Sequence, residues 1–212
     1  MTPIQLYTYG TPNGHKVSIM LEEVGLPYEV RVVDIEQGDQ RSPDFLALNS
    51  NGKIPVIVDP DRGRTVVESG AILPYLAERS GRLLPATEEE RLATSQWTLF
   101  QAAHVGPMMG QLWHFKVFAE ERLPYAIGRY EREVARILGV LDGELARRPY
   151  LAGDRYGIAD VMTWTWVHAH PELGLSLDAY PSLRRWHDAI AGRPAVRRGL
   201  AVPSPREQEQ AA

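Results

Sequence analysis

The spacing of apolar residues changes near position 80 of the 212-residue chain, and this change limits the folds open to it. Up to that point, short apolar runs typical of strands alternate with segments of helical spacing. The runs at 4–9 and 28–33 flank a helical segment and predict a strand–helix–strand unit. The runs at 53–58 and 64–67 are separated by a turn rich in Asp, Pro and Gly, and they predict a hairpin followed by a helix from Ser69.

This order of elements is that of a thioredoxin-like domain, with a four-stranded mixed sheet and helices on both faces. Residues 81–86 break the periodicity and are expected to form a linker, and the segments after them have helical spacing throughout. The fold class predicted is therefore α/β plus all-α: a thioredoxin-like domain at 1–80, an all-helical domain at 87–202, and a flexible polar tail at 203–212.

Composition excludes several classes of function. The net charge is −4, without the clustered Lys and Arg that a nucleic-acid surface needs. No apolar run approaches the roughly 20 residues of a membrane span, and the first residues lack the pattern of a signal peptide, so a cytoplasmic protein is expected. His168 and His170 are two apart on a predicted helix and cannot share a face, so no metal site is expected.

The sequence contains no cysteine. This excludes structural disulfides, thiolate metal sites and a catalytic protein thiol. If the protein performs thiol chemistry, the sulfur must therefore arrive on a small molecule.

Ile54 and Pro55 begin the third predicted strand. A trans proline at a strand edge is the ordinary interpretation, since only about one X-Pro bond in twenty is cis in folded proteins. In a thioredoxin-like order, however, the proline at this position is placed to be cis. A cis bond would turn the backbone N–H and C=O of Ile54 away from the sheet, where they can pair with an extended peptide.

Glu68 and Ser69 lie at the predicted junction between the fourth strand and its helix. Serine is a common helix N-cap, so a purely structural role is one interpretation. In the functional interpretation, Ser69 and the free N–H groups of the helix bind a carboxylate, while Glu68 accepts a hydrogen bond from an amino group. A γ-glutamyl end carries both groups on one carbon and fits this pair.

The loop from Thr11 to Lys16, with the sequence TPNGHK, opens the first predicted helix. A hydroxyl, a side-chain amide and the unpaired N–H groups of a helix start converge there, and these donors favour a thiolate over a thiol. A plain turn without a ligand is the alternative. Thr and Asn cannot serve as a base at neutral pH, so catalysis would depend on lowering the pKa of a ligand thiol.

The segments TPNG, NGKIP and ESGAI are specific together, although none suffices alone. With them the chain resembles the glutathione transferases over about its whole length, and it is most similar to the bacterial nu-class enzymes, relatives of the yeast nitrogen-regulatory prion protein. The resemblance implies a homodimer that binds glutathione as a cosubstrate, without a metal, at the edge of the sheet. It also implies glutathione-dependent reduction of small organic disulfides.

The resemblance further assigns residues of this chain to the two ends of glutathione. Thr11 and Asn13 would contact and stabilise the thiolate. Gln40 and Lys53 would hold the glycine carboxylate, and Ile54 would pair with the cysteinyl backbone.

The remaining assignments concern the γ-glutamyl end and the dimer. Glu68 and Ser69 would bind the γ-glutamyl group, Pro55 would be the structural cis-proline, and Arg129 would reach the site from the partner subunit.

Two positions depart from the family. Gly157 replaces a Ser or Thr helix cap, to which Asp160 can still reach back, and Pro74 predicts a kink in its helix.

Two alternative functions are compatible with the same scaffold. The first is conjugation of glutathione to a carbon electrophile, with Tyr7 or Tyr9 activating the thiol, although packing roles are favoured for both. The second is a regulatory or binding module that holds glutathione without turnover.

Overall fold

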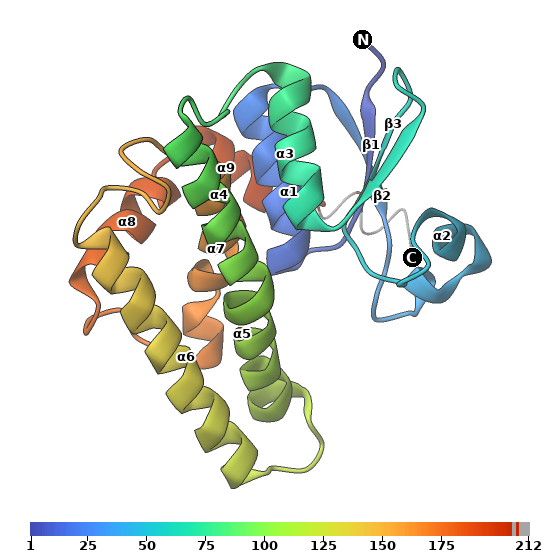
Figure 1. Ribbon diagram of the computed structural model, residues 1–212. Helices are drawn as coiled ribbons and strands as arrows, with labels where there is room; N and C mark the ends of the chain where they lie inside the picture. Colours follow the sequence, from blue (N-terminus) through green and yellow to red (C-terminus); the bar gives the residue numbers. More distant parts are fainter. Residues whose placement is uncertain (205–206, 208–212) are drawn as a thin grey trace. The chain divides into compact units, whose positions relative to one another are not determined.

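The computed structural model describes residues 1–204 and residue 207. Its contacts divide the chain into two compact units, one formed by residues 1–84 with the segment from Gly192, and the other by residues 85–191 (Figure 1). The thioredoxin-like and helical parts that the sequence predicts are thus both present. The predicted tail at 203–212 falls mostly outside the described residues.

The first unit is built on a four-stranded mixed sheet in the order β2-β1-β3-β4. β1 is parallel to β2 and antiparallel to β3, and β3 is antiparallel to β4. The strands are β1 Ile4–Thr8, β2 Tyr28–Val32, β3 Val56–Asp59 and β4 Arg64–Val67. The predicted strand–helix–strand unit and hairpin are confirmed, with β3 starting after Pro55.

Helices α1 Pro12–Val24 and α3 Ser69–Ser80 cover one face of this sheet, and α2 Pro43–Leu48 lies on the other side (Figure 1). The short 3-10 helix η1 Asp39–Arg41 precedes α2. Gly25 caps the end of α1 in the left-handed conformation, with φ 70°. α3 runs as one helix through Pro74.

α9 Pro194–Leu200 packs against α1 within the first unit. This segment falls within the range 87–202 that the sequence assigns to the helical domain, because apolar spacing does not show which surface covers a helix. The two helices approach closely at Gly199, where an added Cβ would lie 2.5 Å from Cα of Ile19. The hydroxyl of Ser18 donates to the carbonyl of Gly199 at 2.7 Å, which ties the helices together.

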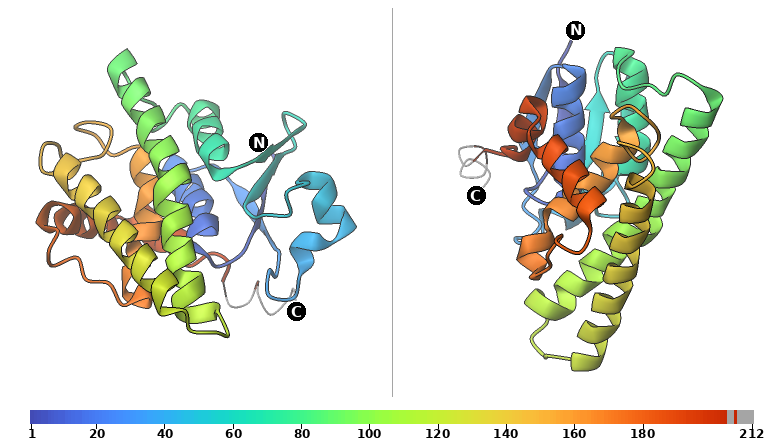
Figure 2. Two further views of the ribbon diagram at one scale, coloured as in Figure 1. Left: turned by 60° about the horizontal axis from the view of Figure 1, so that its bottom comes forward. Right: turned by 90° about the vertical axis from the view of Figure 1, so that its left-hand side faces the viewer.

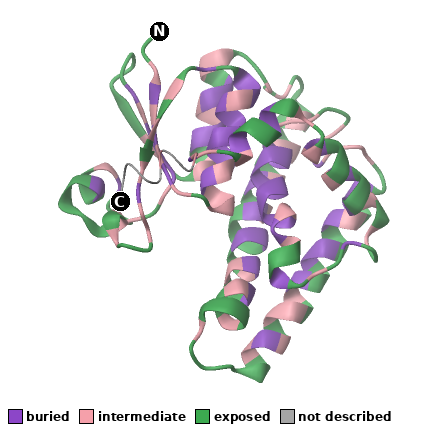
Figure 3. Ribbon diagram, turned by 180° about the vertical axis from the view of Figure 1, so that it is seen from behind, coloured by how far each residue is buried: buried purple, intermediate pink, exposed green. Residues whose placement is uncertain are grey.

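The second unit is helical throughout its regular elements (Figure 2). Its helices and helical turns are α4 Glu88–Phe100, η2 Gln101–Val105, α5 Gly106–Trp113, η3 His114–Phe118, α6 Pro124–Leu145, α7 Ile158–His168, η4 His170–Leu173 and α8 Pro181–Ala191. α4 and α5 form one rod, joined by the π-helical turn η2 rather than broken at Gly106 and Pro107. Figure 3 shows that α7 is buried along nearly its whole length.

Thr87 and Glu90 both contribute hydrogen bonds at the start of α4. Thr87 Oγ1 accepts a hydrogen bond from the backbone N–H of Glu90 at 3.1 Å, whereas the Glu90 carboxylate accepts from Ala86 at 2.6 Å. The carboxylate thus reaches one residue beyond the N-cap. None of the described helices is long and apolar enough to cross a membrane.

Candidate active site

The strand register brings four predicted segments to one end of the sheet. β1 ends in the loop that carries Thr11, and β2, which is parallel to it, ends in the loop that carries Gln40. β3 runs the other way, so its first residues, preceded by Ile54 and Pro55, lie at this same end. Val56 pairs with Val67, and Glu68 therefore follows directly beside Pro55.

Thr11 is the N-cap of α1. Its Oγ1 accepts a hydrogen bond from the backbone N–H of Gly14 at 3.2 Å, and in the described part of the chain its own hydroxyl hydrogen has no acceptor. An added Cβ at Gly14 would overlap the carbonyl oxygen of Tyr9 and lie 2.5 Å from Thr8 Oγ1. This close approach holds the start of α1 against the end of β1. Because the Thr11 oxygen only accepts in its bond with Gly14, the Thr11 hydroxyl can donate to a ligand.

Lys16 is buried just behind this loop, with 3% of its surface exposed. Its Nζ donates to Asn13 Oδ1 at 3.0 Å and lies 3.5 Å from Ser69 Oγ. Burial lowers the pKa of Lys16 to about 7, and the charge of Glu68 opposes this shift. The start of α1 and the start of α3 are therefore joined through one ammonium group.

Glu68 and Ser69 connect β4 to α3 as predicted. Glu68 is exposed and has φ 66°, a conformation that costs a non-glycine residue about 1–3 kcal/mol and persists where the surroundings enforce it. No side chain of the described residues caps α3. The first N–H groups of the helix and the Ser69 hydroxyl can therefore receive a carboxylate.

Ile54, Lys53 and Gln40 form the neighbouring part of the site. The peptide bond between Ile54 and Pro55 is cis, and within the described chain the backbone N–H and C=O of Ile54 have no hydrogen-bond partner. Lys53 has an exposed side chain, and its carbonyl accepts from Asn49 Nδ2 at 2.8 Å.

Gln40 approaches this loop by its backbone, because a Cβ added to Gly52 would lie 3.1 Å from the Gln40 carbonyl oxygen. The side-chain amide of Gln40 donates to the carbonyl of Ile35 at 3.1 Å, and its Oε1 is buried without a partner among the described residues. One N–H of that amide is thus engaged within the loop.

The two strand tyrosines have other partners. Tyr7 packs its ring near Phe45 of α2, at 6.4 Å between centroids, and its hydroxyl donates to Gln5 at 3.3 Å. Burial raises the pKa of Tyr9, as do the charges of Asp34 and Glu36, so its hydroxyl stays protonated. The contacts of Tyr7 favour the packing role expected for it from the sequence.

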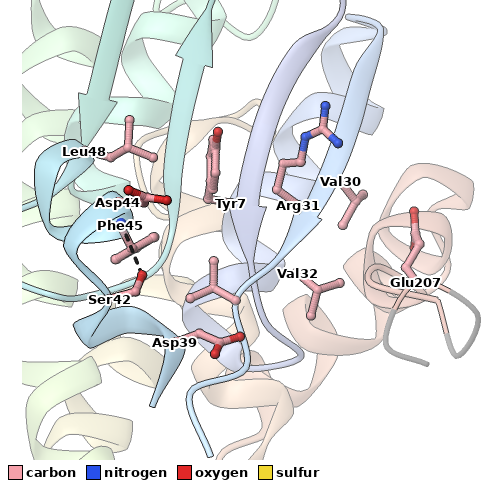
Figure 4. Close-up of a pocket in the computed structure, with 11 residues that line it drawn as sticks. Tyr7, Val30, Arg31, Val32, Asp39, Ser42, Asp44, Phe45, Leu48 and Glu207 are labelled. Atoms are coloured by element: carbon pink, nitrogen blue, oxygen red, sulfur yellow. Dashed lines mark hydrogen bonds between the residues drawn. The ribbon is translucent and has the colours of Figure 1, made fainter. Parts of the chain in front are cut away.

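Tyr7 also lines a hollow of about 670 Å³ between β2 and α2 (Figure 4). Its walls combine Val30, Val32 and Phe45 with the charged side chain of Arg31. None of the described residues predicted to bind glutathione lines it, so this hollow is separate from the site at the strand ends.

Arg129 lies on α6 of the other unit, where it is exposed. Within the described residues, no group of three or more His, Asp or Glu side chains is arranged to hold a metal ion. His168 and His187 instead share a hydrogen bond of 3.0 Å between ring nitrogens.

The thioredoxin-like sheet and the separate helical unit define the class of the glutathione transferases. Residues 11–79 match the glutathione S-transferase N-terminal domain family, and residues 107–194 match the C-terminal domain family. The disulfide-bond oxidoreductase YfcG of Escherichia coli K12 is 44% identical over 202 residues, which cover 93% of this chain and 94% of that protein.

Solved structures of glutathione transferases are similar to this chain. A glutathione transferase from Burkholderia graminis, with two glutathione molecules bound per subunit, is 44% identical with a TM-score of 0.90, over 96% of this chain and 89% of that one. One from Pseudomonas putida, with one glutathione disulfide bound per subunit, is 42% identical with a TM-score of 0.88, over 95% and 92%. The chain therefore belongs to the glutathione S-transferase family of enzymes.

Sequence reasoning missed Lys16 and the close approach at Gly14. A signal for Lys16 was present, because residues three apart on a helix share a face and Lys16 follows Asn13 at that spacing. No sequence pattern shows the approach at Gly14, since it depends on where the chain returns from β1.

Proposed function

We propose that the protein uses bound glutathione to reduce small organic disulfides. The observation that carries the proposal is the donor set at the start of α1: a Thr11 hydroxyl with no acceptor in the described chain, beside the N-terminal end of a helix. Because the chain has no cysteine, the reacting sulfur belongs to glutathione. The similarity to a disulfide-bond oxidoreductase, and to a structure that holds glutathione disulfide, supports this reaction.

In the proposed reaction, the thiolate of glutathione attacks one sulfur of the disulfide, and the other sulfur leaves as a thiolate that takes up a proton. A second glutathione thiolate then attacks the mixed disulfide. This second step releases the other thiol and forms glutathione disulfide. Two glutathiones thus supply two electrons and two protons, and a relative with two glutathione molecules per subunit supports room for both.

Thr11 and Asn13 stabilise the thiolate as hydrogen-bond donors, together with the positive end of α1. The unpaired backbone of Ile54 binds the cysteinyl residue as an added strand would. Lys53 and Gln40 hold the glycine carboxylate.

The other end of glutathione lies at α3. Glu68 and Ser69, with the uncapped N–H groups of that helix, hold the γ-glutamyl group. Arg129 reaches the site from the partner subunit of a homodimer. The protein acts in the cytoplasm, where glutathione is kept reduced.

The test is reduction of a small model disulfide, with glutathione disulfide measured through a coupled reductase. We expect robust turnover by the wild type and weak conjugation of a chlorinated aromatic. Thr11→Val, which removes the hydroxyl but keeps the shape, should lower kcat/KM about tenfold or more, whereas Thr11→Ser should retain most activity.

Tyr7→Phe and Tyr9→Phe should leave disulfide turnover nearly unchanged. Loss of activity in a tyrosine variant and not in Thr11→Val would instead indicate conjugation chemistry. Tight glutathione binding without any turnover would contradict the proposal and indicate a binding module.

A further inference from the structure

Lys16 occupies a position that folding alone does not favour. It is the fifth residue of α1, and its side chain is removed from water, which is costly for a cation. The charge of Glu68 offsets only part of this cost, as the lowered pKa of the lysine indicates. A buried cation is favoured when an anion binds beside it.

The hydrogen bond from Lys16 to Asn13 determines which way the Asn13 amide faces. In its charged form the ammonium group has donors only and binds the amide oxygen, and the Nζ to Oδ1 distance is 3.0 Å. The two N–H donors of the amide are then on the side away from Lys16. Rotation of the amide by half a turn would break this bond and present its oxygen, which would repel a thiolate.

The same ammonium group lies 3.5 Å from Ser69 Oγ at the start of α3. Asn13 and Ser69 are 56 positions apart in the chain and belong to the parts of the site assigned to the two ends of the γ-glutamyl-cysteine unit. One charged group thus holds both parts in place.

From this geometry we infer that Lys16 is a positioning residue for thiolate formation, which directs the Asn13 amide donors toward the glutathione sulfur and fixes Ser69 beside them. The inference rests on the proposed function, since it deepens the role of that same site. Its consequence is measurable on bound glutathione itself, before any disulfide is added.

The experiment is a pH titration of the ultraviolet thiolate absorbance of glutathione bound to the full-length protein. The chain has no cysteine, so the only thiolate in the sample belongs to glutathione. The spectrum of the S-methylglutathione complex is subtracted to remove tyrosine ionisation. Wild type is compared with Lys16→Met, which keeps the length and apolar stem, and with Lys16→Gln, should the first variant not fold.

We expect Lys16→Met to raise the pKa of the bound thiol by about one unit or more, which is a tenfold smaller thiolate fraction at a fixed pH below both values. Because burying the ammonium group is costly, the variant should unfold at about the wild-type temperature. Lys116→Met is the matched control, since Lys116 makes an exposed ion pair with Glu131 in the other unit. It should leave the thiol pKa unchanged.

A double-mutant cycle tests whether Lys16 acts through Asn13. In an Asn13→Ala background, Lys16→Met should change the thiol pKa by much less than in the wild type. Equal effects in both backgrounds, or an unchanged thiol pKa in Lys16→Met, would overturn the inference. If the wild type lowers the thiol pKa through Lys16 but reduces no disulfide, the proposed function fails and the inference stands.

Discussion

Asp160 allows a quantitative prediction about the stability of the helical unit. Its carboxylate is fully buried and accepts three hydrogen bonds: from Leu151 N at 3.0 Å, from Trp186 Nε1 at 2.8 Å and from Gly157 N at 2.9 Å. The last of these is the expected contact back to the start of α7, and it compensates for the glycine at the cap. Asp160 thus joins the start of α7 to α8 and to the preceding loop.

Asp160→Ala leaves these donors without a partner. Leu151 and Trp186 are buried, and each unsatisfied buried donor costs about 1–3 kcal/mol. Loss of the contact to Gly157 removes helix capping worth about 1 kcal/mol. We therefore expect the free energy of unfolding of the helical unit to fall by at least about 3 kcal/mol.

The assay is equilibrium unfolding in urea followed by tryptophan fluorescence. All five tryptophans lie between residues 97 and 186, so this signal reports on the helical unit. Asp178→Ala is the matched control, because the Asp178 side chain is 82% exposed and pairs only with exposed groups, and it should cost less than about 1 kcal/mol. A loss in Asp160→Ala no larger than in this control would refute the reasoning.

The pH dependence gives a second test of Asp160. Burial raises its pKa to about 6 against the three hydrogen bonds, compared with 3.8 as the reference value. Between these pH values the folded state therefore binds more protons than the unfolded state. The contribution of Asp160 to the free energy of unfolding is fully present below pH 3.8 and is lost as the pH rises through about 6. The stability difference between wild type and Asp160→Asn should therefore grow as pH falls from 7 to 4, by up to about 3 kcal/mol. A constant difference over this range would contradict the assignment.

Three further substitutions follow from the structure. Gly14→Ala would force the start of α1 away from Tyr9 and should weaken glutathione binding at least tenfold by calorimetry, in a protein that still unfolds cooperatively. Gly199→Ala should cost about 1–3 kcal/mol in urea unfolding by separating α9 from α1, whereas Gly139→Ala, with open space at its Cβ, should be neutral or stabilising. Arg129→Ala should weaken glutathione binding without changing the sedimentation coefficient of the proposed homodimer, and equal affinity in both proteins would contradict the proposed role of Arg129 in the partner's site.

The elements of the first unit were predictable because their signals are local. Gly25 ends α1 where a left-handed cap is needed, and a turn rich in Asp, Pro and Gly joins β3 to β4. The partner of α9 was not predictable, because an apolar helix face does not identify the surface that covers it. Its packing on α1 depends on the absence of a side chain at Gly199, which has meaning only once both helices are placed.

The order of the strands along the chain explains why the predicted site residues lie at one end of the sheet. In a mixed sheet with this order, the ends of β1, β2 and β4 and the start of β3 meet at the same edge, so every loop there faces a common ligand. What the order does not contain is the direction of each side chain. Asn13 can present either an oxygen or two donors, and its hydrogen bond from the neighbouring ammonium of Lys16 favours the donors.

Lys16 and Glu68 are both locally unfavourable, and this shared property argues for function. A buried cation and a non-glycine residue at positive φ each cost free energy that a purely structural residue would avoid. Both lie at the sheet end where glutathione is proposed to bind, and the charge of one acts on the other. Residues that are unfavourable for folding are expected where ligand binding determines the residue type. Lys16 and Glu68 therefore indicate the same binding site as the loops at the sheet end.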